Sequence, residues 1–181
     1  MNEAIATYGS LDTVLITAAL MLSAPLKKWT VEMWDRSVAL NLRMPFFFAQ
    51  AAAPHLEKSD NASIILISST GAIRGHAGMS AYQATKAALP GLCRSLTAEL
   101  GPLGIRINTL MPGWIDTPFN DPFWEYQQNP ETRRLEIERQ IPLRRQGQPD
   151  EVASMVLFLA SPAGRYVAGT SIVIDGGYTA V

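Results

Sequence analysis

The fold is easiest to establish from residues 69–86, Ser69-Thr-Gly-Ala-Ile-Arg-Gly-His-Ala-Gly-Met-Ser-Ala-Tyr82-Gln-Ala-Thr-Lys86. This stretch follows Ile64-Ile65-Leu66-Ile67, a continuous apolar run typical of a strand buried on both faces of a parallel sheet. Ligand sites in open α/β sheets gather at the carboxyl ends of the strands. The sequence therefore predicts a functional site beginning at Ser68 and Ser69.

Tyr82 and Lys86 stand four residues apart in a segment rich in helix formers, so both side chains should share one helix face. A cation beside a phenol favours the phenolate, which predicts a lowered pKa for Tyr82. Such a tyrosine can pass a proton to or from an alcohol or carbonyl oxygen. The pair alone is weak support, because a solvated helix face is its ordinary explanation.

Together with Ser69, thirteen residues before Tyr82, the pair resembles the active site of the short-chain dehydrogenase/reductase family. The resemblance implies that Tyr82 is the acid/base and that Ser69 orients the substrate carbonyl. It implies for Lys86 a second contact, to the nicotinamide ribose of NAD or NADP.

A fourth catalytic residue is implied by Trp34-Asp-Arg followed by Asn41-Leu42, which matches the corresponding family segment. There Asn41 would hold a water relay to the lysine. Without the resemblance, an isolated asparagine within a helix is more simply solvent-facing or bonded to the backbone.

The loop 111–118 resembles the Pro-Gly loop of the family, which contacts the nicotinamide half of the cofactor. Another cofactor segment of the family, Asn-Asn-Ala-Gly, is here Ile16-Thr17-Ala18-Ala19, so both amides are missing. The resemblance implies cofactor contacts at Thr17, Ala18, Pro112, Gly113, Ile115 and Thr117, with Trp114 at the substrate.

Composition indicates an ordinary globular chain of one domain, residues 1–181. The net charge of −1 offers no basic surface for nucleic acid or a membrane, and no metal site is predicted. Cys93 is the only cysteine, which excludes an intrachain disulfide and favours a reducing cytoplasm. Residues 15–26 are uncharged but too short to span a bilayer.

The order of elements predicts an α/β fold, a partial Rossmann-like doubly wound parallel sheet that resembles the fourth to seventh strands of the family. A helix should end at Gly9, and Thr30 should cap a helix that kinks near Pro45. Pro90 should free the carbonyl of Lys86 for water. Strands are expected at 11–17, 64–67, 105–110 and 169–175, and helices at 31–57, 80–100 and from 149.

The loop 71–78 contains three glycines but is not interpreted as a dinucleotide-binding turn, because the next helix begins only near Ser80. Arg74 and His76 could touch substrate, although exposed loop residues are the better interpretation. Residues 118–141 resemble the family's substrate lid. Their aromatic side chains indicate an apolar or ring-bearing substrate or, equally, the packing of a short surface helix.

The family's opening glycine-rich turn, Thr-Gly-x-x-x-Gly-x-Gly, does not occur before Leu11. The strand at 11–17 is therefore expected at an exposed sheet edge. The favoured function is an NAD- or NADP-dependent oxidoreductase that interconverts a small-molecule carbonyl and a secondary alcohol, in a chain shortened at its start.

Two other functions are alternatives. The first is a truncated, non-catalytic relative that serves oligomerisation or regulation without binding cofactor. The second is a lyase-like dehalogenase, which Lys86 disfavours because arginine replaces the lysine in such relatives. In each case the resemblance implies a homodimer or homotetramer formed through helices 31–57 and 80–100.

Overall fold

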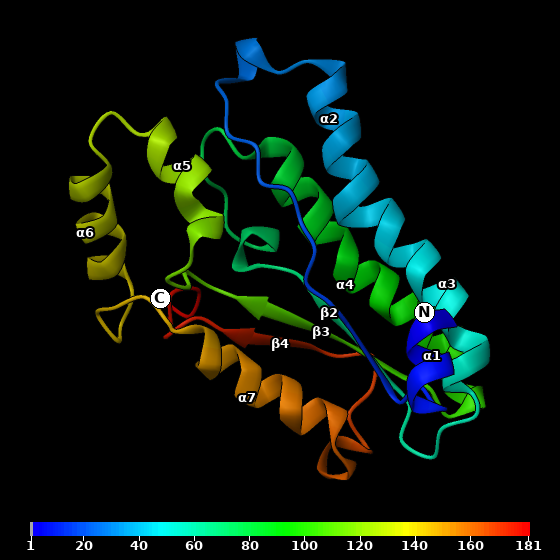
Figure 1. Cartoon of the computed structure of the whole chain (residues 1–181). Helices are drawn as coiled ribbons and strands as arrows, with labels where there is room; N and C mark the ends of the chain where they lie inside the picture. Colours follow the sequence, from blue (N-terminus) through cyan, green and yellow to red (C-terminus); the bar gives the residue numbers. More distant parts are fainter. Residues whose placement is uncertain (1) are drawn as a thin grey trace.

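The computed structural model describes residues 2–181, and Met1, the first residue of the predicted domain, lies outside the described residues. Four parallel strands form one sheet in the order β1 (Thr13–Ile16), β2 (Ser63–Ile67), β3 (Arg106–Pro112) and β4 (Ser171–Ile174) (Figure 1). The predicted α/β class, a parallel sheet flanked by helices, is confirmed.

The longer helices are α1 (Asn2–Tyr8), α2 (Val31–Val38), α3 (Met44–Leu56), α4 (Ser80–Leu100), α5 (Asp121–Tyr126), α6 (Pro130–Gln140) and α7 (Pro149–Ala160). Short 3-10 turns are η1 (Leu26–Lys28), η3 (Thr70–Ala72), η4 (Gly101–Leu103), η5 (Pro118–Asn120) and η6 (Pro162–Gly164). The Thr30 side chain accepts a hydrogen bond from the Met33 amide, so the predicted cap of α2 is confirmed.

A π-helical turn, η2 (Ala39–Arg43), joins α2 to α3 where the sequence predicted a kink. The Met44 amide donates to the carbonyl of Ala39, five residues earlier. Pro45 has no N–H, so the carbonyl of Asn41 lacks its ordinary helical donor. The irregularity is therefore a widened turn, and the chain continues as α3.

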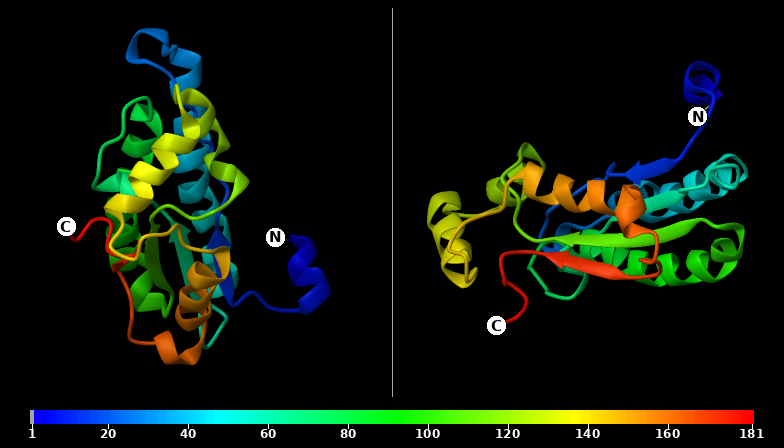
Figure 2. Two further views of the ribbon diagram at one scale, coloured as in Figure 1. Left: turned by 90° about the vertical axis from the view of Figure 1, so that its left-hand side faces the viewer. Right: turned by 90° about the horizontal axis from the view of Figure 1, so that it is seen from below.

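The helices cover the two faces of the sheet unequally (Figure 2). On one face, Val14, Ile64 and Ile107 form a buried cluster with side chains of α3 and α4. On the other face, Ile65 and Leu110 pack against α7. Successive residues of a strand point to opposite faces, so this division follows from the alternation along each strand.

The helix α1 ends at Gly9, whose φ of 79° and amide bond to the Ile5 carbonyl match the predicted cap. In both views of Figure 2, α1 projects away from the rest of the molecule. Within the described residues β1 pairs only with β2, and Leu15 is 41% exposed. The outer edge of β1 is therefore open in this structure.

Candidate active site

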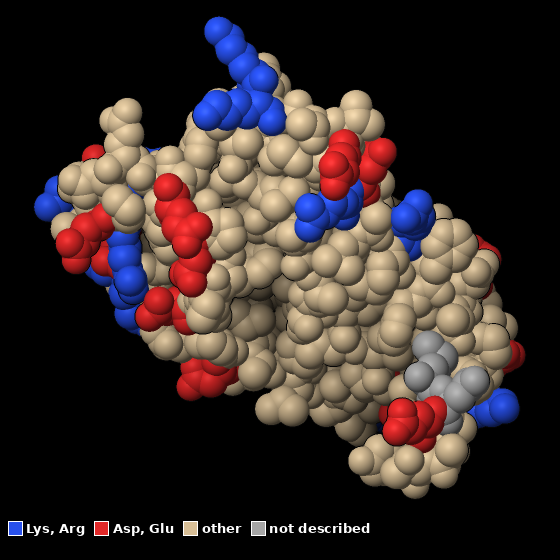
Figure 3. All heavy atoms as spheres, turned by 45° about the horizontal axis from the view of Figure 1, so that its top comes forward, with Lys and Arg blue, Asp and Glu red and all other residues tan. Residues whose placement is uncertain are grey.

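A cavity of about 460 Å³ opens at the carboxyl ends of the strands. Ala19, after β1, lines it, whereas Ala18 and Asn41 do not. Figure 3 shows one face of the molecule with a hollow bordered mostly by uncharged atoms. Most of the residues predicted from the sequence line the cavity: Thr17, Ser69, Tyr82, Lys86, Pro112, Gly113, Trp114, Ile115 and Thr117.

Tyr82 and Lys86 project from the same face of α4, as their spacing predicted. The Lys86 ammonium nitrogen lies 5.7 Å from the centre of the Tyr82 ring. Both side chains are buried, with exposed fractions of 6% and 3%. Lys86 Nζ donates to the Ile67 carbonyl at 2.6 Å, so the end of β2 holds the ammonium group in place.

The predicted lowering of the Tyr82 pKa is wrong for the protein by itself. Burial raises the pKa of Tyr82 to about 12, although a side-chain hydrogen bond with Ser69 acts in the opposite direction. Burial also lowers the pKa of Lys86 to about 8. Desolvation disfavours the charged form of both groups, and here it outweighs their proximity.

Ser69 stands at the turn between β2 and η3. Its hydroxyl oxygen accepts a hydrogen bond from the Gly71 amide at 3.0 Å, and the residue caps η3. A Cβ at Gly71 would lie 3.3 Å from that oxygen, so glycine leaves the hydroxyl unhindered. Because the turn fixes its backbone, Ser69 presents its hydroxyl to the cavity and to Tyr82.

Asn41 is 1% exposed, which excludes the solvent-facing interpretation. Its Oδ1 accepts from the Leu20 amide at 2.7 Å, and its Nδ2 donates to the Leu20 carbonyl at 2.8 Å and to Thr85 Oγ1 at 3.2 Å. Thr85 in turn donates to the Tyr82 carbonyl. Asn41 thus fastens the segment after β1 to the helix that carries Tyr82 and Lys86.

Ser68, which is 2% exposed beside Ser69, makes a contact that sequence reasoning missed. Its hydroxyl donates to the Lys86 carbonyl at 2.7 Å. This is the carbonyl that Pro90 leaves without a helical donor, and the sequence assigned it to water. The proline was the signal, but the partner is the residue that follows β2, 18 residues earlier.

The loop between η3 and α4 places Arg74 and His76 differently. The Arg74 guanidinium lies 3.8 Å from the centre of the Tyr178 ring and donates to the Tyr178 carbonyl and to Gln140. Arg74 therefore anchors the C-terminal segment, whereas His76 lines the cavity. At Gly78, with φ of 86°, a Cβ would lie 2.8 Å from the Tyr126 ring, so glycine allows α5 to pack closely on the loop.

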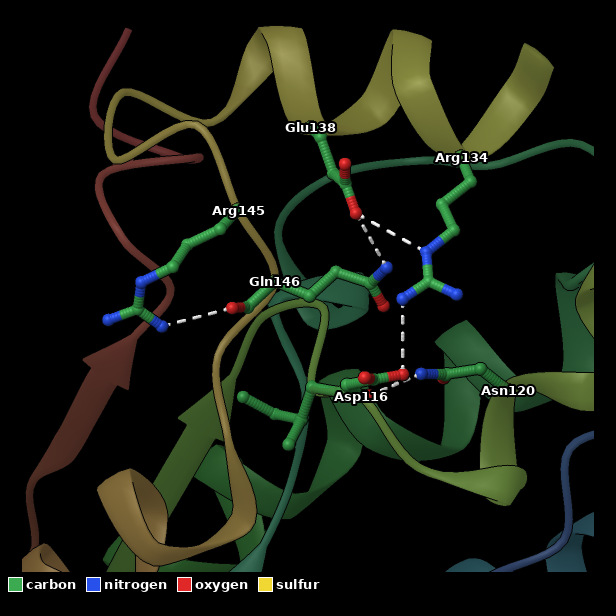
Figure 4. Close-up of polar contacts among 7 residues, drawn as sticks. Asp116, Asn120, Arg134, Glu138, Arg145 and Gln146 are labelled. Carbon is green, nitrogen blue, oxygen red and sulfur yellow. Dashed lines mark hydrogen bonds and ion pairs between the residues drawn. The ribbon is translucent and has the colours of Figure 1, made fainter. Parts of the chain in front are cut away.

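Polar contacts tie α6 to the loop after β3 (Figure 4). Arg134 pairs with Asp116 and with Glu138, both at 3.3 Å. Glu138 also accepts a hydrogen bond from the Gln146 amide group at 3.0 Å. Asp116 lies between Ile115 and Thr117, so these contacts connect α6 to a wall of the cavity.

Within residues 2–181, no cluster of three or more His, Cys, Asp or Glu side chains could hold a metal ion. In the same part of the chain, no helix has the length and apolar character needed to cross a membrane.

Comparison with known proteins identifies the family to which the chain belongs. The family model described as Enoyl-(Acyl carrier protein) reductase matches residues 1–179. The 3-oxoacyl-[acyl-carrier-protein] reductase FabG of Thermotoga maritima is 36% identical over 177 residues, which cover 98% of this chain and 70% of the relative. The chain belongs to the short-chain dehydrogenase/reductase family.

Solved structures agree. Ligand-free aldohexose dehydrogenase of Thermoplasma acidophilum has a TM-score of 0.93 at 30% identity, covering 99% of this chain and 72% of that one. A blue fluorescent protein from a metagenomic library, in complex with NADPH, has a TM-score of 0.87 at 37% identity, covering 98% and 68%. The chain spans 61 to 70% of the lengths of the curated relatives it matches.

Proposed function

We propose that the protein is an NAD- or NADP-dependent oxidoreductase that interconverts a carbonyl compound and a secondary alcohol. One observation carries the proposal: Ser69, Tyr82 and Lys86 converge on a single cavity at the carboxyl ends of the strands. Membership of a family of oxidoreductases supports the reaction class.

In the direction of reduction, the Ser69 hydroxyl donates a hydrogen bond to the substrate carbonyl and holds it beside Tyr82. The Tyr82 hydroxyl then gives its proton to the carbonyl oxygen. A pKa of about 12 keeps Tyr82 protonated at neutral pH, which suits this acid role. In the direction of oxidation, the same oxygen receives the proton of the alcohol.

Lys86 stabilises the phenolate that forms when Tyr82 gives up its proton. Its pKa of about 8 leaves the ammonium charged at neutral pH yet close to titration, so Lys86 can also return a proton to Tyr82. Asn41 holds the frame through Thr85 and Leu20. We propose that its carbonyl, which lacks the donor that Pro45 cannot supply, receives a water that relays protons to Lys86.

The cavity residues fit the nicotinamide half of the cofactor, which when bound supplies or accepts the hydride. The described structure gives Lys86 Nζ one acceptor, Ile67, so further ammonium hydrogens are available for ribose hydroxyls. Thr17, Pro112, Gly113, Ile115 and Thr117 line the same space. We propose Ala18 as a backbone neighbour of this site, although it does not line the cavity. A relative solved with NADPH supports the cofactor class.

A second candidate is a relative that keeps the fold without binding cofactor by itself. Among the described residues, each α-helix after a strand is separated from it by a long connection, such as residues 68–79 before α4. A pyrophosphate cradle formed by a short turn and a helix N-terminus is therefore absent from this part of the chain. Titration with NADH and NADPH distinguishes the candidates, because only the first requires saturable binding.

Residues 118–141 are proposed as the substrate lid of a single domain, and a homodimer or homotetramer is proposed through α2, α3 and α4. Large apolar side chains on the surface of α2 and α3 support the assembly: Trp34 is 45% exposed and Phe47 is 55% exposed. Sedimentation of Phe47→Glu beside the unaltered chain tests it. A smaller assembly is expected for the variant, and an unchanged mass would contradict the proposal.

The reaction is tested with Tyr82→Phe, which removes the acidic proton and keeps the ring. NADPH-linked reduction of a panel of cyclic and aryl ketones should fall by about 10²-fold or more. The matched control is Tyr166→Phe, because Tyr166 is fully exposed and its hydroxyl should be irrelevant. Circular dichroism verifies that both variants fold, and equal rates for the two would refute the acid/base role.

A further inference from the structure

Four ring side chains pack together at one corner of the cavity: His76, Trp114, Phe123 and Tyr178. We call this cluster the aromatic corner. In it, the other three rings hold the His76 imidazole in one orientation. The centre of the His76 imidazole lies 5.4 Å from that of Trp114, with the rings near perpendicular at 78°. Phe123 meets it edge-on at 6.2 Å, and the Tyr178 ring is parallel to it within 6° at 6.2 Å. Three rings, from the loop after β3, from α5 and from the C-terminal segment, therefore fix one imidazole.

The neighbours of His76 are themselves buried. Trp114 is 8% exposed, Phe123 is 2% exposed and Tyr178 is 1% exposed. Arg74 covers the Tyr178 ring and is hydrogen-bonded at both ends of its guanidinium. Rings packed in this way restrict the imidazole to few orientations, so its nitrogens address a defined region of the cavity.

The ring nitrogens of His76 form no hydrogen bond within residues 2–181, although the side chain lines the cavity. Because His76 is half-buried and lines the cavity, its ring nitrogens are available to a ligand there. Burial and the charges of Arg133 and Arg74 lower the pKa of His76 to about 4. At neutral pH the imidazole is therefore uncharged, with one donor and one acceptor nitrogen.

The rest of the wall is apolar where a substrate would lie. Met21, Met79 and Phe119 line the cavity together with Trp114, and no carboxylate of residues 2–181 does. Aromatic and thioether groups favour contact with a flat or cyclic hydrocarbon body. The corner thus combines an apolar surface with one neutral hydrogen-bonding ring.

We infer that His76 is a specificity-determining residue that hydrogen-bonds a second, uncharged oxygen of a ring-bearing carbonyl or alcohol substrate. The reacting oxygen lies at Ser69 and Tyr82, and the second oxygen, a hydroxyl or a carbonyl, lies at the aromatic corner. The inference rests on the proposed function for the identity of the reacting group. It adds the class of substrate: cyclic compounds with two oxygen functions at separate positions.

The test compares 4-phenylcyclohexanone with 4-(4-hydroxyphenyl)cyclohexanone by ligand-observed NMR titration of the full chain, which requires no turnover. Because a neutral hydrogen bond contributes about 1 kcal/mol, the hydroxylated ketone should bind the unaltered protein about fivefold more tightly. His76→Phe keeps the ring packing and should abolish the preference. His76→Gln offers a donor and an acceptor and should retain part of it.

His55→Phe is the matched control, because His55 lies in α3 and does not line the cavity. The inference is overturned if His76→Phe keeps the preference, if the unaltered chain has none, or if neither ketone binds. Tyr82→Phe should leave the preference intact. If the preference depends on His76 but the protein does not reduce ketones, this inference stands and the proposed function is rejected.

Discussion

The two faces of the sheet differ in how completely they are covered. On the face of α3 and α4, Leu56, Ile64 and Cys93 have no exposed surface. On the other face, Ile65, Leu110 and Leu159 are equally buried, but α7 is the only helix of the described residues in the cluster, and Leu15 at the sheet edge is 41% exposed. One face is closed like the centre of a doubly wound fold, and the other is only partly covered.

The two faces of the sheet contribute different parts of the cavity. Tyr82 and Lys86 extend from α4, which belongs to the closed face, whereas Val152 and Val156 of α7 contribute a wall from the open face. Proton transfer needs side chains held within a fraction of an ångström, and dense packing provides that support. The proposed chemistry is therefore built on α4, on the face of the sheet that two helices cover.

The largest expected effect is a loss of stability from a change on the face covered by α3 and α4. Leu56→Ala should lower the free energy of unfolding by about 2–5 kcal/mol, because it leaves a cavity in a packed core. Leu157→Ala, the same change on the exposed surface of α7, should alter it by at most about 0.5 kcal/mol. Urea denaturation measures both. Similar losses in the two variants would show that Leu56 does not lie in a packed core.

The next effect concerns Lys86, the buried charge on the closed face. Its pKa is lowered from 10.5 to about 8, so the unfolded chain binds more protons between these pH values. Stability of the unaltered protein should therefore rise with pH across this window, relative to Lys86→Met, by about 3 kcal/mol. Below pH 8 the difference between the two proteins should be constant.

Denaturant titrations of both proteins at pH values from 7 to 10.5 measure this difference. The variant retains Tyr82, so the titration of the phenol largely cancels in the comparison. A difference that does not change with pH would mean that Lys86 is not desolvated in the folded protein.

A smaller effect is expected at Ser68, which follows β2 and donates to a carbonyl of α4. Ser68→Ala leaves the Lys86 carbonyl without its donor and should lower the unfolding free energy by about 1–3 kcal/mol. Ser154→Ala is the matched control on the open face. Its hydroxyl also donates to a helix carbonyl, that of Asp150, but at an exposed position. Thermal melting of both should rank Ser68 well above Ser154, and the reverse order would contradict the proposed support of α4.

The smallest effect is expected at Arg134, which joins α6 to Asp116 (Figure 4). Arg134→Ala should lower the unfolding free energy by no more than about 1 kcal/mol, because the pair is exposed and screened by salt. Arg133→Ala serves as control, since Arg133 pairs only with Glu136 of its own helix. If the contact positions α6, Arg134→Ala should increase proteolysis of residues 118–141 at low salt, and Arg133→Ala should not.

Much of the fold was predictable because its signals are local. The run 64–67, the cap at Thr30 and the glycine end of α1 each depend on a few adjacent residues, and the structure has β2, α2 and α1 at those places. The convergence of Ser69, Tyr82 and Lys86 was predictable for a related reason. Parallel strands end at one edge of a sheet, and residues four apart share a helix face.

Other features could not be found locally. Arg74 and His76 are two residues apart and look equivalent in the sequence, yet Arg74 is held by Tyr178 and Gln140 while His76 lines the cavity. Their difference depends on Gln140 and Tyr178, which lie 66 and 104 positions after Arg74. The lysine carbonyl was assigned to water because nothing in the local pattern points to Ser68 as its donor.

Periodicity and spacing act over a few residues, so the α/β class, the order of the elements and the shared helix face of Tyr82 and Lys86 could be predicted from the sequence, while the resemblance supplied the other residues expected at the cavity. The acidity of Tyr82 and the uneven cover of the sheet depend on tertiary packing. The charge of Lys86 predicted a lowered phenol pKa, but burial raises it to about 12. Desolvation sums the displacement of water by every neighbouring segment, and no short stretch of sequence contains that sum.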